Sequence, residues 1–400
     1  FRQSGDDIEL AASLRERGFA EVFGGSLKDA EWLLGEAEAL SDRLGDGRGR
    51  AWVRQHQAWS AFLSGDTELA ETRLMAAAEE FDLLGDRAGR GWALGLLAYV
   101  RFFQRRFEES EELAVKVRAE SVELGDRWAP AMMDSLIASI RLWTTRFSEA
   151  EELSRKALTG FRELNDRFGV VQALGPRLRA LIALGRLHEA ERGLEEALTM
   201  SESYGNLSFP AVTAAGAAVH LGLGVRGVSI AELAVERGTR MGAEGSESSV
   251  TLALALCQAG RADDALAILE GIERDFPYAA AVTALASALT GDAAASIELA
   301  AGVSDEVGAT YLDVVIAAIA AAASEGRLGI HDAARARLDS AKAVAADAGD
   351  VVAKELVAAM SAGMVGEGPV ADRYELAVGW RTVVDGLIEM AGMTPVLSEE

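Results

Sequence analysis

A short turn-forming tripeptide recurs every 40 residues through the first half of this 400-residue chain. It reads Leu-Gly-Asp in three copies and keeps related residues in two more, at Leu44–Asp46, Leu84–Asp86, Leu124–Asp126, Leu164–Asp166 and Tyr204–Asn206. A second mark falls half a period later, at Gly25-Ser26, Gly65-Asp66, Arg105-Arg106, Thr145-Arg146, Gly185-Arg186 and Val225-Arg226. Two marks per period leave segments of roughly 16–18 residues, which is a usual helix length. The spacing therefore predicts a repeating array of helix pairs.

The segments between the marks have the residue pattern of amphipathic helices. Residues 147–158 place their apolar side chains at intervals of three to four on one face. Glu151 and Arg155 lie four apart on the opposite face, where opposite charges stabilise a helix. At the marks, Gly85 can end a helix in the left-handed conformation, and Asp86 can cap the first free amides of the next helix. Each mark therefore predicts a helix boundary.

No run of alternating β-branched residues competes with these helices, so the predicted fold class is all-α. The expected architecture is a right-handed α-solenoid of stacked helix hairpins, with about eighteen helices in nine pairs. Residues 1–244 hold the regular 40-residue repeats, and residues 245–400 hold shorter, alanine-rich, irregular repeats. The boundary between them falls at Gly242–Ser246, and Tyr374–Met390 is predicted to be a final capping helix.

Composition narrows the range of partners. Lys and Arg total 39 against 63 Asp and Glu, which gives a formal net charge of −24. This charge opposes binding to polyanions, so neither nucleic acid nor an anionic membrane is expected as a direct partner. Most of the negative charge lies in residues 201–400, where a basic protein segment would dock most readily.

The chain is also expected to be a cytoplasmic fragment of a multidomain protein. It starts at Phe1 rather than Met, and no basic-then-apolar signal segment opens it. Its most apolar run, Val314–Ala323, is about half as long as a membrane span.

Few residues have the spacing that catalysis or metal binding requires. Gly222–Gly227 reads GxGxxG, but it falls on a predicted turn between helices rather than after a strand, so we interpret it as a turn. The four histidines are His56, His188, His220 and His331, and no two of them have the spacing of paired metal ligands. The single cysteine, Cys257, lies in an apolar stretch and is interpreted as a buried, unreactive thiol. We therefore expect no catalytic residue, no metal, no cofactor and no enzymatic activity.

The second mark of each repeat resembles the opening of the second helix in tetratricopeptide repeats. Gly185–Ala190 matches that motif fully, and four other copies match it in part. The small residues where paired helices would touch are Ala58, Ala98, Ala138 and Ala218 in first helices and Ala70, Ser110, Ala150, Ala190 and Ala265 in second helices, with Leu178 as the exception. The resemblance covers nearly the whole chain and implies a tetratricopeptide-like superhelix, although the period is 40 rather than the usual value of about 34.

Long repeats that end in Leu-Gly-Asp-Arg also resemble the C-terminal superhelical region of large bacterial, especially actinobacterial, regulators. These regulators are of the LuxR-like maltose-activator type or the adenylyl-cyclase type, in which an ATPase and an output module precede the array. The resemblance implies that this chain is the sensor and partner-binding arm of such a signal-transduction or transcription regulator.

One row of side chains on the predicted first helices has the chemistry of a binding surface. Aromatic residues seven apart share a helix face and recur one repeat later, and alignment to tetratricopeptide repeats places them along a concave groove. The candidate groove residues are Trp52, Trp59, Trp92, Tyr99 and Phe102, with Arg101, Arg141 and Arg179 as receptors for carboxylates. The alternative is that the same rings pack between repeats as core.

The predicted function is a non-enzymatic protein- or ligand-binding repeat module. The expected partner is a protein or peptide, a small-molecule effector, or a basic domain of the same regulator. The alternative is an assembly scaffold that self-associates through its alanine-rich half.

Overall fold

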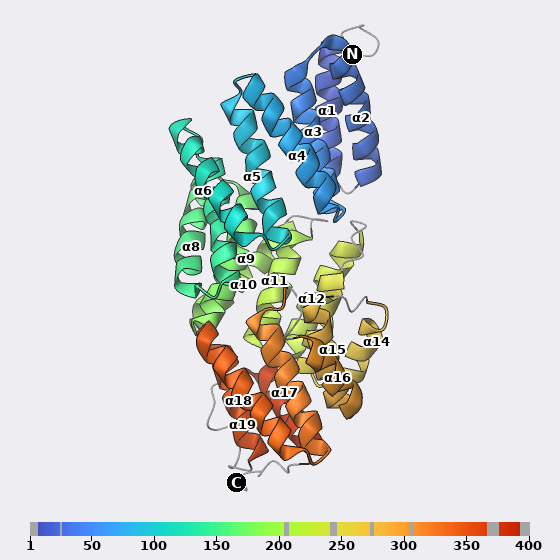
Figure 1. The fold of residues 1–400 in the computed structure, drawn as a ribbon, viewed down its shortest axis with the longest axis vertical. Coiled ribbons are helices and arrows are strands. Elements are labelled where there is room, and N and C mark those ends of the chain that lie inside the picture. The colour runs from blue at the N-terminus through green and yellow to red at the C-terminus, as the bar shows by residue number, and fades with distance from the viewer. Residues whose placement is uncertain are drawn as a thin grey trace. The chain divides into compact units, whose positions relative to one another are not determined.

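The computed structural model describes residues 7–24, 26–203, 208–240, 246–272, 276–303, 308–365 and 376–392, which form twenty α-helices and no strand. The predicted all-α solenoid of stacked hairpins is therefore confirmed, with two helices more than expected. The helices are α1 (Asp7–Gly24), α2 (Leu27–Leu44), α3 (Gly47–Leu63), α4 (Thr67–Leu83), α5 (Arg87–Phe103), α6 (Phe107–Glu123), α7 (Trp128–Trp143), α8 (Phe147–Glu163), α9 (Arg167–Ala183), α10 (Leu187–Ser203), α11 (Phe209–Leu221), α12 (Val225–Arg240), α13 (Ser246–Gln258), α14 (Ala262–Leu269), α15 (Pro277–Thr290), α16 (Ala293–Val303), α17 (Tyr311–Arg327), α18 (His331–Ala348), α19 (Val351–Met364) and α20 (Val378–Met390) (Figure 1).

The repeated marks end one helix and begin the next, as predicted. Gly45 and Gly85 have φ values of 66° and 68°, in the left-handed region that glycine adopts without a Cβ clash. Asp86 then accepts a hydrogen bond from the backbone N–H of Gly89 at 2.9 Å and caps the following helix. Copies of the marks at 25 and 204–206 lie outside the described residues.

Three marks hold the left-handed turn without glycine. Arg105, Thr145 and Asn165 have φ values of 63°, 58° and 54°. This conformation is unfavourable for residues with a Cβ, and most of all for a β-branched threonine. The turn is therefore imposed by the packing of the helix pairs on either side of it, and glycine is the residue that fits it at the smallest conformational penalty.

Small residues bring the two helices of each repeat into close contact. Every predicted contact residue is fully buried, namely Ala58, Ala70, Ala98, Ser110, Ala138, Ala150, Ala190, Ala218 and Ala265. The exception, Leu178, is also buried, and its larger side chain fits because Gly193 lies opposite on α10. A Cβ added to Gly193 would be 2.4 Å from Leu178 Cδ2, so the glycine provides the room that alanine provides elsewhere.

The chain packs into two compact units. Unit 1 comprises Phe1–Arg141, Glu152–Ala173 and Arg240–Ala243, and unit 2 comprises Leu142–Glu151, Leu174–Thr239 and Glu244–Glu400. The predicted boundary at 244/245, which separates regular from irregular repeats, lies outside the described residues. The two packing units do not test it, because repeat regularity and packing are different properties, so it stays a prediction.

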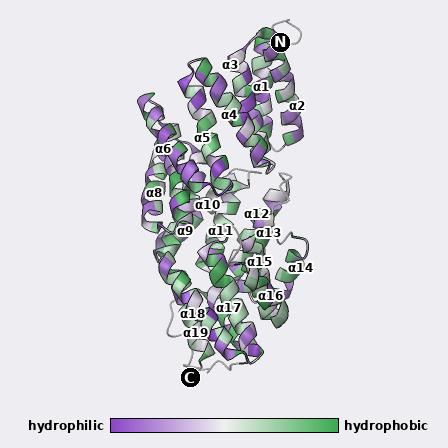
Figure 2. Cartoon of the chain, viewed as in Figure 1, coloured by the Kyte–Doolittle hydropathy of each residue, from purple (hydrophilic) through white to green (hydrophobic). Residues whose placement is uncertain are grey.

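Unit 2 contains the most apolar helices. In Figure 2, hydrophilic residues are frequent on α6 and α8, whereas α15 and α17 are mainly pale or green. Nearly every residue of α15 and α17 is buried. Across the described ranges, no helix combines the length and hydropathy needed to cross a membrane.

The last helix of unit 2 docks against the glycine-rich turn at 222–227. α20 contacts α13, α15, α17 and α19, and its first residues reach the turn between α11 and α12. The Gly379 backbone N–H donates to the Gly222 carbonyl at 2.8 Å, and the Trp380 indole N–H donates to the His220 carbonyl at 3.1 Å. A Cβ on Gly222 would be 2.5 Å from Trp380 Cδ1. The GxGxxG run is therefore an inter-helix turn, as predicted, and its first glycine gives Trp380 the space to pack.

Substituting Gly222 with alanine should loosen α20 and destabilise unit 2. The variant must adopt φ near +70° with a Cβ, which costs about 1 kcal/mol, and it must also displace the fully buried Trp380. Overpacking of this kind adds roughly 1–3 kcal/mol. The midpoint of urea unfolding, followed by circular dichroism, measures the loss.

Gly349→Ala is the matched control. Gly349 ends α18 at φ +78°, and a Cβ added to it would have no other atom within 4 Å. The Gly349→Ala variant should therefore lose only the stability that the unfavourable φ costs. Equal losses of stability in the two variants would show that Trp380 of α20 does not pack tightly against Gly222.

Candidate functional site

The aromatic residues predicted on α3 pack within unit 1. The Trp52 ring lies 5.1 Å from Phe81 in an edge-to-face contact, and 5.9 Å from His56. Trp59 packs against two buried clusters, one formed by α1, α2 and α3 and one by α3, α4 and α5. Both tryptophans are half-buried, so most of each ring contributes to contacts between helices.

The aromatic residues of α5 connect it to the following repeat. Trp92 stacks on Trp128 with ring centroids 4.8 Å apart and 15° between the planes, yet 38% of Trp92 stays exposed. The Tyr99 hydroxyl donates to the Met132 carbonyl at 3.3 Å, and burial raises the pKa of Tyr99. Phe102 contacts Phe103, which is 57% exposed. These rings pack between repeats and also leave aromatic edges open to solvent, so their role in binding stays a prediction.

The three predicted arginines differ in what they contact. Arg101 lies 3.4 Å from a Glu71 carboxylate oxygen and also pairs with Glu109, while Arg141 donates two hydrogen bonds to Glu111. Both therefore hold neighbouring second helices by ion pairs within unit 1. Arg179, on α9 in unit 2, forms no hydrogen bond and no ion pair with any described residue.

The positive charge of Arg179 acts on titratable side chains of unit 2. Burial lowers the pKa of His220 well below its usual value, and the positive charge of Arg179 lowers it further. Burial raises the pKa values of Tyr278 and Tyr311, and the charge of Arg179 partly offsets both shifts. One guanidinium therefore acts on residues of α11, α15 and α17.

Contacts between distant repeats explain how these helices come together. The Phe147 and Tyr311 rings lie 5.9 Å apart, although they are far apart in the sequence. A Cβ on Gly185 would lie 3.3 Å from Val351 Cγ1, at the start of α19. Within unit 2, the α8 and α9–α10 segments thus meet the first turns of α17 and α19.

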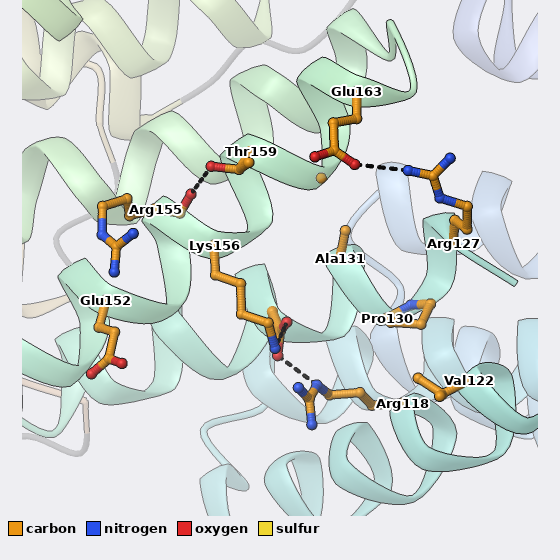
Figure 3. A pocket seen from close by; sticks show the side chains of 12 residues that line it. Arg118, Val122, Arg127, Pro130, Ala131, Glu152, Arg155, Lys156, Thr159 and Glu163 are labelled. Carbon is orange, nitrogen blue, oxygen red and sulfur yellow. Dashed lines mark hydrogen bonds and ion pairs between the residues drawn. The ribbon is translucent and has the colours of Figure 1, made fainter.

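A pocket of about 500 Å³ opens between α6, α7 and α8 in unit 1. Asp134 forms its base and is only 3% exposed. Arg118 Nε and Lys156 Nζ approach its two carboxylate oxygens at 2.6 Å and 2.9 Å. Figure 3 shows the side chains of Arg118 and Lys156 pointing toward each other within the pocket.

The rim of this pocket has mixed charge. Glu163 accepts a hydrogen bond from Arg127 at 2.7 Å, while Glu152 and Arg155 line the pocket without an ion pair to any described residue (Figure 3). One carboxylate at the base faces two cations, which leaves a small positive excess. The signal for it in the sequence is Asp134 itself, a carboxylate inside the apolar run of α7 that belongs to none of the repeated marks.

The single cysteine and three of the histidines lie either in the packed interior or on the exposed surface. Cys257 is buried, as predicted, and burial raises the pKa of its thiol to about 12. His188 and His331 are exposed. His56 is buried, stacks on Phe19 at 4.1 Å and bonds to Gln55. Within the described ranges, no group of three His, Cys, Asp or Glu side chains could hold a metal ion.

Solved structures with the same architecture exist. A Rap protein complexed with Competence and Sporulation Factor aligns with 85% of this chain and 98% of its own, at 13% identity and a TM-score of 0.62. The apo form of the quorum sensor NprR from B. thuringiensis aligns with 84% of this chain and 99% of its own, at 11% identity and a TM-score of 0.53. The apo form of RapI aligns with 84% of this chain and 97% of its own, at 12% identity and a TM-score of 0.53. No known protein family and no curated protein matches the sequence. At these identities, the likeness establishes a tetratricopeptide-like helical array.

Acidification should destabilise the protein in a window set by His56. Burial, together with the charge of Arg15, lowers the pKa of His56 from 6.5 to about 4. Between these values the unfolded chain binds a proton that the folded chain does not, so stability should fall as the pH drops from 6.5 to 4, by up to about 3 kcal/mol.

His56→Phe keeps a ring to stack on Phe19 but removes the titration. Urea unfolding at several pH values should show a shallower fall between pH 6.5 and 4 in this variant than in the unmodified chain. His220 and the carboxylates contribute equally to both proteins. Identical pH dependence would show that His56 is protonated as readily when folded as when unfolded.

Proposed function

We propose that this chain is a non-enzymatic module that binds a protein or peptide on the surface of its helical repeats. The observation that carries the proposal is the fold, which is similar over most of its length to a Rap protein solved with Competence and Sporulation Factor. Stacked repeats present an extended surface built from many helices, and this architecture is widely used for macromolecular recognition.

Accessible side chains on the first helices support the proposal. Trp92 and Phe103 on α5 keep open aromatic edges, and the half-buried Arg179 on α9 has no hydrogen bond or ion pair with any described residue. Aromatic rings give a large contact area at a low entropy cost, and arginine binds carboxylates with two parallel hydrogen bonds. A peptide presents both apolar side chains for the aromatic rings and carboxylates for the arginine along one extended chain.

We further propose that the array is the sensing arm of a larger bacterial regulator of the LuxR-like maltose-activator or adenylyl-cyclase type, in the cytoplasm. The sequence resemblance supports this, and the name of NprR, a quorum sensor, is consistent with a sensing role for the fold. A bound peptide, small-molecule effector or basic domain of the same regulator would favour one curvature of the array and so bias an attached output module.

Trp92 provides a test of the binding surface. Trp92→Ala should weaken the binding of peptides selected from a random display library against the full 400-residue chain by about tenfold, because exposed aromatic anchors contribute much of the binding energy. Trp32→Ala is the control, since Trp32 is 59% exposed but lies on the second helix α2. Fluorescence titration measures both affinities. Failure to select any peptide would refute the proposal that the chain is a peptide-binding module.

Self-association is the alternative function, and unit 2 offers apolar residues for it. Val225, Leu328 and Val378 are all more than half exposed. If the chain were an assembly scaffold, its light-scattering mass would rise with concentration, whereas a binding module keeps the mass of one chain. A monomer up to about 100 µM, which corresponds to a dimer weaker than about −5.5 kcal/mol, would exclude the scaffold.

A further inference from the structure

The C-terminal helix α20 lies across the hairpin turns of unit 2. It contacts four first helices, α13, α15, α17 and α19. At the turn after α11, a Cβ on Gly222 would be 2.5 Å from Trp380 Cδ1. At the turn after α15, a Cβ on Gly291 would be 2.9 Å from Met390 Cε. One helix therefore covers the same edge of successive repeats in unit 2.

The face of α20 that meets this edge is apolar and has a point of close approach. Trp380, Val383, Val384 and Leu387 are spaced i, i+3, i+4 and i+7, and all four are buried. This spacing is typical of an amphipathic helix that docks in a groove. A Cβ on Gly386 would be 2.9 Å from Leu289 Cδ2, so the glycine lets the helix approach the edge closely.

A shared backbone hydrogen bond aligns the turns of unit 2 with those of unit 1. After the first helices, the left-handed residue donates its N–H to the carbonyl three residues earlier, at Gly65, Arg105, Gly222, Gly260 and Gly291. The residue two positions before the left-handed one therefore has the same place in each of these repeats. It is His220, Gln258 and Leu289 in unit 2, and Leu63 and Phe103 in unit 1.

In unit 2 the residues at this aligned position lie against α20. The His220 carbonyl accepts a hydrogen bond from the Trp380 indole N–H at 3.1 Å. A Cβ on Gly379 would be 3.0 Å from Gln258 Cβ, and Leu289 meets the close-approach face described above. The aligned position is thus the place where this edge holds a helix.

In unit 1 the aligned position presents an exposed aromatic ring. Phe103 is 57% exposed, and its ring lies 5.1 Å from Phe62 and 5.4 Å from Phe102 in edge-to-face contacts. Phe102 in turn lies 5.6 Å from Phe107, so the four rings form one cluster. A Cβ on Gly65, unlike one on Gly222 or Gly291, would have no other atom within 4 Å. Exposed apolar clusters of this kind are typical of interaction surfaces.

We propose that this aromatic edge of unit 1, formed by Phe62, Phe102, Phe103 and Phe107, docks an amphipathic helix of a partner protein in the way that unit 2 docks α20. The inference rests on the proposed protein- or peptide-binding function and specifies its surface and the kind of partner. The helix presents apolar side chains at i, i+3, i+4 and i+7 and a small residue at the point of closest approach. Because α20 is engaged in unit 2, we assign the helix on unit 1 to a partner.

Two matched peptide libraries test whether the partner is a helix. The first keeps the sequence Leu376–Gly392 and randomises, among apolar residues, the four buried apolar positions of α20 named above. The second is identical except for prolines in place of Thr382 and Asp385, which prevent helix formation. Both are displayed against the full 400-residue chain, and affinities are measured by fluorescence anisotropy. We expect binders from the first library alone.

Phe103→Ser should weaken the selected helices by about tenfold, whereas Leu83→Ser should leave their affinity unchanged. Leu83 is 83% exposed and lies two residues before the left-handed Gly85, so it has the matching place at the opposite turns of unit 1. Phe103→Leu keeps an apolar anchor and should retain most of the affinity.

Hydrogen exchange of the unmodified chain locates the helix without any variant. A docked helix should slow exchange at residues 64–66 and 104–106, because it restrains local opening of these turns. Residues 84–86 and 124–126, at the opposite turns, should exchange at the same rate with and without the peptide. This measurement decides the matter even if Phe103→Ser does not fold.

The outcomes separate this inference from the proposed function. Unchanged affinity in folded Phe103→Ser, or slowed exchange only in unit 2, overturns the docking edge. Absence of helical binders, while random peptides do bind, overturns it as well and leaves the proposed function in place. Absence of binders from every library overturns both. A light-scattering mass that rises with concentration in the unmodified chain but not in Phe103→Ser identifies a second copy as the occupant and overturns the partner helix.

Discussion

Close contact between paired helices at a residue with almost no side chain is the constraint on which this structure depends. Ala58 and Ala70 are fully buried in the first complete repeat, and their counterparts are fully buried in the following repeats. Helices this close are joined by a very short reversal of the backbone, which is the left-handed turn at the marks from Gly45 to Gly185. Thr145 adopts that turn despite its branched Cβ, which shows that the helix contact determines the turn rather than the reverse.

Features that repeat locally could be predicted from the sequence, because each is set by neighbours within one period. The helix boundaries at Gly85-Asp86 and the buried position of Ala190 belong to this class. Contacts between distant segments could not be predicted in the same way. The hydrogen bond from Trp380 to His220 joins residues 160 apart, and no periodic pattern encodes it. The glycines at 222 and 224 are its only trace in the sequence, and they are equally compatible with a simple turn.

The candidate site was predictable in part for the same reason. Arg101, Arg141 and Arg179 look alike in the sequence, since each follows an apolar residue near the end of a first helix. The first two form ion pairs with glutamates that lie 30 residues earlier, on the preceding second helix, at Glu71 and Glu111. Whether an arginine is satisfied depends on which side chains of the preceding repeat face it. That is a property of packing, and residue type alone does not determine it.

Long-range contacts in unit 2 also bear on how well it could bind a ligand. A simple solenoid contacts only its neighbours, so its curvature changes at a small free-energy cost. In unit 2, the contact of Phe147 with Tyr311 and the docking of α20 across α13, α15, α17 and α19 add restraints between repeats that are not neighbours. These restraints fix Tyr311 relative to the helices that precede it, and Asp350 fixes its hydroxyl. A ligand that binds to unit 2 would therefore meet side chains that are already ordered, so the cost of ordering them would not reduce its affinity.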